Sequence, residues 1–136
     1  KENITIHINS HSQSSKEQIL KQALKLHSQK NIVEAAKLYH YFINQGFKDH
    51  RVFSNYGTIL KNVGKSKEAE LLYRKAIEIN PDFAQAHYNL GIILKDLGKL
   101  QDAELYLRKA IALNPERIST YTFLGQVLQG LEELKS

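Results

Sequence analysis

The chain has no cysteine and no methionine, and each absence narrows what it can be. Without cysteine there is neither a disulfide framework nor a thiolate metal site, so no redox feature places the chain outside the cell. We therefore expect a cytoplasmic location. Because the chain begins at Lys1 and lacks methionine, we expect it to be a piece trimmed from a longer protein. No apolar run is long enough to cross a membrane, and no signal-peptide pattern opens the sequence.

Positive charge is in modest excess, and its distribution argues against a nucleic-acid site. Lys and Arg number 19 against 14 Asp and Glu, which gives a formal net charge of +5. These bases are scattered through every segment and usually lie near an acidic residue. A nucleic-acid interface needs a basic patch or stripe, and no cluster of five or more bases occurs. We therefore predict a solvated basic surface, with neither a nucleic acid nor a membrane as partner.

Motifs for catalysis and metal binding are also missing. His7 and His11 have the i, i+4 spacing of ligands on one helix face, but their polar, serine-rich segment offers no acidic third ligand. No glycine-rich phosphate loop follows a strand, and no pairing of a nucleophile with a base is recognisable. We therefore predict that the chain is not an enzyme and holds no metal or cofactor.

The sequence does contain a repeat of 34 residues. Residues 50–83 and 84–117 align without a gap and match at 16 of 34 positions, too many for chance. Each unit has two stripes of apolar residues at helical spacing, separated by Gly64 in one unit and Gly98 in the other. Glycine suits the left-handed turn that ends a helix. Each unit is therefore predicted to form a helix, a tight turn and a second helix, and stacking of units buries the apolar faces.

An Asn-Pro dipeptide closes each unit, as Asn80–Pro81 and Asn114–Pro115. Proline disfavours helical geometry in the preceding residue, so the second helix of each unit is predicted to end there. Asparagine is a good N-cap and proline suits the first helical position. We therefore expect the same dipeptide to start the next helix.

Gly57 and Gly91 lie inside predicted helices, where glycine costs about 1 kcal/mol relative to alanine. We attribute both to close packing between the two helices of a unit. The small residues Ala69 and Ala103, near the start of each second helix, are expected to lie opposite them.

The two clear units resemble tetratricopeptide repeats (TPRs), which have the same period. The residues that carry the resemblance are Phe53, Tyr56, Gly57, Leu60, Ala69, Tyr73, Ala76 and Pro81, then His87, Leu90, Gly91, Leu94, Ala103, Leu107, Ala110 and Pro115. A degenerate first unit spans 16–49, and a partial fourth unit spans 118–136. The resemblance implies an all-α, right-handed solenoid of antiparallel helix pairs, with three repeats and the first helix of a fourth.

Residues 1–15 precede the repeats and are predicted to form a flexible leader. Ile4, Ile6 and Ile8 alternate with polar residues as in a short strand, yet no partner strand is recognisable. The alternative is that these isoleucines dock on the first helix pair.

The resemblance also implies a function, because the first helix of each TPR lines a concave groove. We expect this groove to bind a peptide segment of a protein partner. The candidate residues are Arg51, Asn55, Thr58, Asn62, Gln85, Tyr88, Asn89, Ile92, Lys95, Thr122, Phe123 and Gln126. Asn55 and Asn89 hold the same position in adjacent units, similar to the asparagine ladder of O-linked N-acetylglucosamine transferase. Such amides either grip a peptide backbone or bond only to solvent.

Other functions stay open at this point. The carboxylate clamp of chaperone-binding TPRs is absent, since Gln85 and Asn89, or Ser119 and Phe123 in the other register, fill its basic positions. The chain is then an interaction module or scaffold, the non-catalytic substrate-recruiting arm of a larger transferase-type enzyme, or a self-associating protein. Self-association would use an unpartnered last helix, through Val127, Leu128, Leu131 and Leu134. The share of Lys, Asn and Ile favours a bacterial source.

Overall fold

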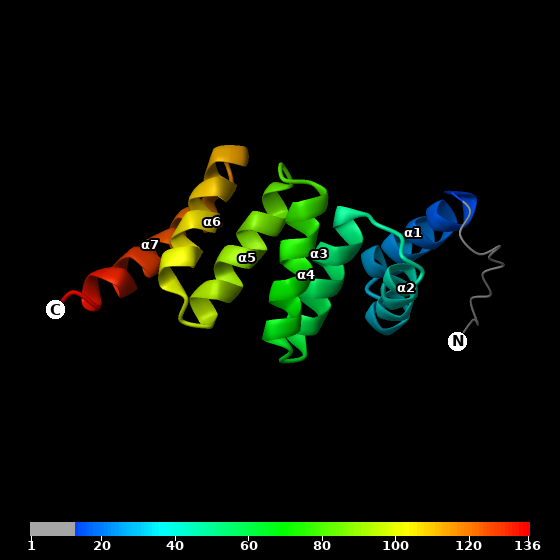
Figure 1. The fold of residues 1–136 in the computed structure, drawn as a ribbon, viewed down its shortest axis with the longest axis horizontal. Helices are drawn as coiled ribbons and strands as arrows, with labels where there is room; N and C mark the ends of the chain where they lie inside the picture. Colours follow the sequence, from blue (N-terminus) through cyan, green and yellow to red (C-terminus); the bar gives the residue numbers. More distant parts are fainter. Residues whose placement is uncertain (1–12) are drawn as a thin grey trace.

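The computed structural model describes residues 13–136, which form an elongated stack of helices in chain order (Figure 1). Within these residues there are seven α-helices and no strand. They are α1 (Gln13–Ser28), α2 (Ile32–Asn44), α3 (His50–Asn62), α4 (Ser66–Ile79), α5 (Ala84–Asp96), α6 (Leu100–Leu113) and α7 (Ile118–Glu133). No helix in this part of the chain has the length and hydrophobicity to cross a membrane.

Consecutive helices pack as pairs, and the pairs then stack. The most extensive contacts join α1 to α2, α3 to α4 and α5 to α6. Each pair contacts the next helix in the chain, and in addition α3 touches α5 and α5 touches α7. The pairs α3–α4 and α5–α6 lie within residues 50–83 and 84–117. This arrangement confirms the prediction of an all-α solenoid built from helix pairs.

Glycines end the first helix of two pairs, as predicted. Gly64 and Gly98 have φ of +87° and +79°, in the left-handed region that glycine adopts without strain. The following amides, of Lys65 and Lys99, donate to carbonyls at the ends of α3 and α5 over 2.9 and 2.8 Å. These bonds satisfy acceptors that a helix end leaves unpaired. In the first pair Lys30 takes the same position, with φ of +62°.

Close packing explains the glycines inside α3 and α5. A Cβ atom on Gly57 would lie 2.8 Å from the ring of Tyr73, and one on Gly91 would lie 2.6 Å from the side chain of Leu107. The predicted close approach is therefore confirmed. The predicted neighbours are confirmed only in part. The backbone oxygen of Ala69 lies 3.4 Å from the Cβ position of Gly57, but the nearest atoms at both glycines belong to the large buried side chains of Tyr73 and Leu107.

The Asn-Pro junction also differs from the prediction. Asn80 caps the end of α4, but α5 begins only at Ala84. The Asn80 side chain accepts from the amide of Asp82 over 3.2 Å, and its carbonyl accepts from the amide of Phe83 over 3.1 Å. Because this turn uses both acceptors of Asn80, the dipeptide closes one helix without capping the next.

The first helix starts earlier than expected. Residues 13–15, assigned to the leader by the sequence, form the first turn of α1, and Ser15 is buried. Ser15 lies one helical turn before Ile19 and two turns before Ala23, on the face that packs on α2. The candidate docking isoleucines and the pair His7 and His11 lie outside the described residues.

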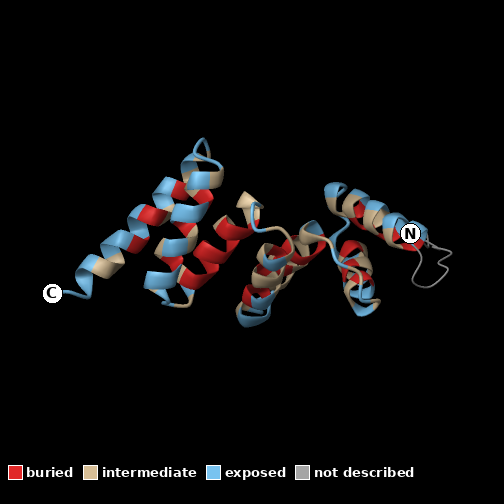
Figure 2. Ribbon diagram, turned by 45° about the horizontal axis from the view of Figure 1, so that its top comes forward, coloured by how far each residue is buried: buried red, intermediate tan, exposed pale blue. Residues whose placement is uncertain are grey.

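The core is thickest around α5, which Figure 2 shows as largely buried. This helix contacts α3, α4, α6 and α7, so neighbours cover it on most sides. The cluster around it consists of Ala69, Tyr73, Leu90, Ile93, Leu94, Ala103, Leu107, Leu124 and Val127. Side chains on α5 therefore project from the most extensively packed helix among the described residues.

The apolar stripe expected on the last helix is divided between core and surface. Val127 is fully buried and Leu131 packs against the core, whereas Leu128 and Leu134 are exposed. The prediction that all four form one unpartnered stripe was therefore wrong. The reason is helical geometry, because Val127 and Leu131, four residues apart, share the face that meets α5 and α6.

Candidate functional site

The first helices of successive repeats, α3, α5 and α7, carry a connected set of polar side chains. Asn89 on α5 donates to the hydroxyl of Ser54 on α3 over 3.3 Å, and it accepts from Gln85 over 2.9 Å. The Nη1 atom of Arg117, just before α7, donates to Gln85 over 2.6 Å. We call these four residues the inner-helix network. Its hydrogen bonds link two repeats, 50–83 and 84–117, and reach the N-cap of α7 at Arg117.

Aromatic side chains continue this surface toward α7. The guanidinium of Arg117 lies over the ring of Tyr88, with its carbon 3.8 Å from the ring centroid. Tyr88 donates its hydroxyl proton to Ser119 over 3.0 Å and meets Phe123 edge to face, with centroids 5.9 Å apart. The ammonium of Lys95 lies 5.5 Å from the centroid of Phe123. Two cations and two aromatic rings are thus held together by α5 and α7.

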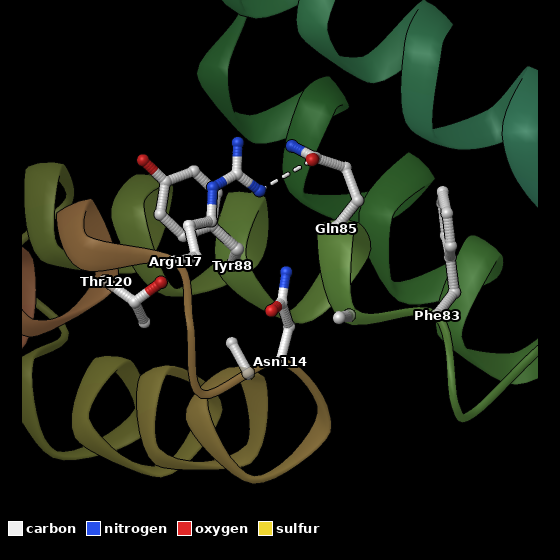
Figure 3. Close-up of a pocket in the computed structure, with 8 residues that line it drawn as sticks. Phe83, Gln85, Tyr88, Asn114, Arg117 and Thr120 are labelled. Atoms are coloured by element: carbon white, nitrogen blue, oxygen red, sulfur yellow. Dashed lines mark hydrogen bonds between the residues drawn. The ribbon is translucent and has the colours of Figure 1, made fainter.

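A cavity of about 180 Å³ opens between the start of α5 and the α6–α7 junction (Figure 3). It is lined by Phe83, Ala84, Gln85, Tyr88, Ala110, Asn114, Arg117 and Thr120. We call it the Arg117 cavity. The Thr120 side chain is 1% exposed, and its hydroxyl has no hydrogen-bond partner among the described residues. Such a buried, unsatisfied polar atom is uncommon in native structures.

Five candidates from the sequence are brought together here. They are Gln85, Tyr88, Asn89, Lys95 and Phe123, which α5 and α7 place on adjoining positions. Asn62, Thr122 and Gln126 are exposed and lie outside the network. These five residues therefore form the part of the surface where candidate side chains contact one another.

Three other candidates are placed less favourably for binding. Arg51 pairs with Asp49 over 3.0 Å, and Asp49 also caps α3. Although burial alone would raise the pKa of Asp49, hydrogen bonds from Arg51 lower it below its ordinary value. Thr58 bonds to the hydroxyl of Tyr73 on α4 over 2.9 Å, and Ile92 is 8% exposed. These three side chains are engaged or buried within the fold, which leaves them less available to a ligand.

The two asparagines of the expected ladder are not equivalent. Asn55 is half-buried and donates to the hydroxyl of Tyr39 on α2 over 3.1 Å. Asn89 is buried and holds Ser54 and Gln85 instead. The alternative that both bond only to solvent was wrong, because each amide has a protein partner. Gripping of a peptide backbone by these amides stays a prediction.

Reasoning from the sequence missed Asn114, Arg117 and Thr120. Asn114 and Arg117 lie at the α6–α7 junction, outside the first helices, and Thr120 is a buried position of α7. One signal was available, since Arg117 stands 34 residues after Phe83, where the equivalent junction carries an aromatic residue. A change from aromatic to cationic at a repeat position marks a difference between units.

A second polar cluster lies between α4 and α6, and its contacts hold these two helices together. Glu70 accepts from Arg74 over 3.0 Å and from Lys99 over 3.1 Å. Burial opposes ionisation of Glu70, but the bonds from Lys99 and Arg74 outweigh it and lower its pKa. Arg74 also donates to Tyr106 over 3.2 Å. Every charge here has a partner, so the cluster offers nothing to a ligand.

Residues 13–136 contain no grouping of three or more His, Cys, Asp or Glu side chains able to hold a metal ion.

Comparison with family models matches residues 84–117 to the tetratricopeptide repeat and residues 57–98 to a TPR repeat model. A comparison with curated proteins finds no significant match.

Several solved structures share the fold. The first TPR of Spaghetti (RPAP3), bound to the HSP90 peptide SRMEEVD, has a TM-score of 0.78 at 20% identity, covering 94% of this chain and 99% of that one. The MamA protein has a TM-score of 0.77 at 20% identity, covering 86% of this chain and 64% of that one. The Sgt2 TPR domain from Aspergillus fumigatus has 0.75 at 16% identity, covering 93% and 84%. With two repeat models matched along the sequence and this fold in space, the chain is a tetratricopeptide repeat protein.

Proposed function

We propose that the chain is a non-catalytic interaction module that binds a peptide segment of a partner protein along α3, α5 and α7. The observation that carries the proposal is the inner-helix network with its adjoining aromatic pair. It sets donors, acceptors and the rings of Tyr88 and Phe123 from successive repeats beside one another. Peptide-binding surfaces combine such polar contacts with a few aromatic anchors.

The structural comparisons support a peptide as the class of ligand. The similar Spaghetti domain was solved with an HSP90 peptide, which is a segment of a protein partner. HSP90 itself is not proposed as the partner of this chain. The basic positions of the carboxylate clamp hold Gln85 and Asn89, or Ser119 and Phe123 in the other register. The partner must therefore be sought without that assumption.

A display selection with two matched variants tests the proposal. Linear peptides displayed on phage are selected on the wild-type chain and then measured on each variant by fluorescence anisotropy. The groove variant combines Tyr88→Ala with Phe123→Ala. The control variant combines Leu71→Ala with Leu105→Ala, which truncates two exposed apolar side chains on the outer helices α4 and α6.

The proposal expects peptides that bind the wild type and the control variant equally and lose at least about tenfold in affinity on the groove variant. Circular dichroism must show that both variants keep wild-type helicity. Peptides that depend on Leu71 and Leu105 but not on Tyr88 and Phe123 would place binding on the outer face and contradict the proposal.

Self-association is a second candidate, favoured by the exposed apolar residues on one face of α7. Ile118 is 80% exposed, and Tyr121 and Leu128 are exposed on the same helix. A Cβ atom on Gly125 would meet no atom within 4 Å, although Gly57 and Gly91 at the same repeat position are filled. Sedimentation should then show a mass that rises with concentration and falls back to monomer in Leu128→Lys. A monomer at every concentration would sink this candidate.

A further inference from the structure

We propose, resting on the proposed peptide-binding function, that the Arg117 cavity takes the carboxylate of an aspartate or glutamate side chain in the bound peptide. The inference concerns the α6–α7 junction, where Arg117, Thr120 and Asn114 meet the start of α5. None of these three residues belongs to the expected set of groove positions.

Arg117 carries a charge that the chain does not neutralise. Its three fellow arginines, Arg51, Arg74 and Arg108, each pair with a carboxylate over 3.0, 3.0 and 2.9 Å. No Asp or Glu among residues 13–136 lies within ion-pair distance of Arg117, and the adjacent Glu116 is exposed and unpaired with it. The one arginine without an acidic partner among the described residues thus lines the Arg117 cavity.

The guanidinium is held in place with donors to spare. It lies over Tyr88 and gives one N–H to Gln85. A guanidinium has five N–H donors, so most of them remain available. Stacking on a ring restricts the side chain before any ligand arrives, which lowers the entropy cost of binding. Figure 3 shows the Arg117 head group beside the amide of Gln85, above Asn114.

A second observation, at Thr120 in the first turn of α7, also points to a ligand. Thr120 is almost fully buried, and its hydroxyl finds no partner in the described part of the chain. Figure 3 shows this hydroxyl pointing toward the space beside Asn114. A hydroxyl can donate to a carboxylate oxygen, as can the amide of Asn114. The first turn of α7 adds the positive end of a helix dipole, which favours an anion.

Size and charge select the ligand. The volume of about 180 Å³ lies below the roughly 300 Å³ at which small-molecule sites begin, so one side chain fits better than a cofactor or nucleotide. A phosphate group carries about two negative charges and would leave one of them unmatched by a single arginine. A carboxylate matches the one charge that the cavity offers. The apolar lining residues Phe83, Ala84 and Ala110 suit the methylene groups of such a side chain.

The test uses the full chain and peptides recovered on it by the phage selection described above. Each recovered peptide is resynthesised in three forms, with its acidic residue kept, changed to the matching amide, or changed to phosphoserine. All forms are titrated against the wild type, Arg117→Gln and Arg108→Gln. Arg108→Gln removes the same charge from an exposed site on α6, so it reports the general electrostatic effect alone.

We expect acidic residues to be enriched among the recovered peptides, and the acidic form to bind most tightly. The amide and phosphoserine forms should each lose roughly tenfold or more on the wild type, as expected for loss of a charge-assisted hydrogen bond. Arg117→Gln should lose a similar factor for the acidic form and no longer distinguish acid from amide, whereas Arg108→Gln should stay within about twofold.

The outcomes separate this inference from the proposed function. If peptides need Tyr88 and Phe123 but show no acid preference and bind Arg117→Gln as well as Arg108→Gln, the function stands and the carboxylate site is wrong. Tighter binding of phosphoserine would also overturn it, since the site would then be a phosphate site. The amide peptide leaves the protein unchanged, so the test remains decisive even where Arg117→Gln is unstable.

Discussion

The guanidinium of Arg117 lies directly over the ring of Tyr88, so a residue of the α6–α7 junction is fixed against α5. Cation–π contacts of this kind contribute about 0.5 to 2 kcal/mol, depending on exposure. We predict that a double-mutant cycle with Arg117→Gln and Tyr88→Leu, measured by urea unfolding, gives a coupling of about 0.5 to 1 kcal/mol. The pair Arg108→Gln and Tyr88→Leu should show none, and equal coupling in both cycles would contradict a direct contact.

Asn89 is predicted to contribute more to stability than its position on a binding surface suggests. Asn89→Ala removes the donor to Ser54 and leaves two polar partners without their bonds. The free energy of unfolding should fall by about 1 to 3 kcal/mol. Asn62→Ala, at an exposed position on α3, should change it by less than about 0.5 kcal/mol. Urea unfolding of the two variants checks this, and equal effects would mean that the network contributes nothing.

Gly91 and Gly125 occupy the same repeat position and should respond oppositely to alanine. Gly91→Ala sets a Cβ atom against Leu107 and should destabilise the chain by about 1 to 3 kcal/mol. Gly125→Ala meets open space, so the better helix propensity of alanine should stabilise it by up to about 1 kcal/mol. Thermal unfolding should shift in opposite directions. Destabilisation by both changes would show that the space beside Gly125 is occupied in solution.

His27 should make stability depend on pH. Its Nδ1 atom lies 2.8 Å from the hydroxyl of Tyr39, which already accepts from Asn55. The hydroxyl proton is therefore directed at His27, which can accept it only when neutral. Burial lowers the pKa of His27, so the unfolded chain takes up a proton at a higher pH than the folded chain.

The sign follows from this difference in proton binding. The free energy of unfolding should fall as the pH drops below about 6.5, the ordinary value for histidine, and level off below the folded pKa. His27→Gln should reduce that slope, and His40→Gln, at an exposed position of α2, should keep it. Urea midpoints across this range provide the measurement. A wild-type slope retained in His27→Gln would show that other groups cause the loss.

The repeat itself could be read from the sequence because it rests on local chemistry. Gly64 and Gly98 mark helix ends through backbone geometry, and Gly57 and Gly91 mark close packing whatever the partner residue is. The partner, a large buried side chain, depends on how the second helix is rotated, which the period does not reveal. The start of α5 was missed because hydrogen bonding within the turn at Asn80 competed with capping.

The site was only partly predictable for a similar reason. The expected groove positions lie on first helices, and they located Gln85, Tyr88 and Phe123 on adjoining helices. Arg117 was missed because its relation to Tyr88 depends on a junction that folds back over α5. The burial of Ile92 follows from contacts on several sides of α5, which spacing along one helix does not show.

The most direct test of the central claim is a nuclear magnetic resonance titration of the labelled chain with a peptide recovered by display. If the surface of α3, α5 and α7 binds the peptide, amide shift changes will concentrate in these three helices and at the α6–α7 junction. They will be small along α2, α4 and the exposed face of α6. Shift changes concentrated on α4 and α6, with α5 and α7 unaffected, would contradict binding on the inner helices.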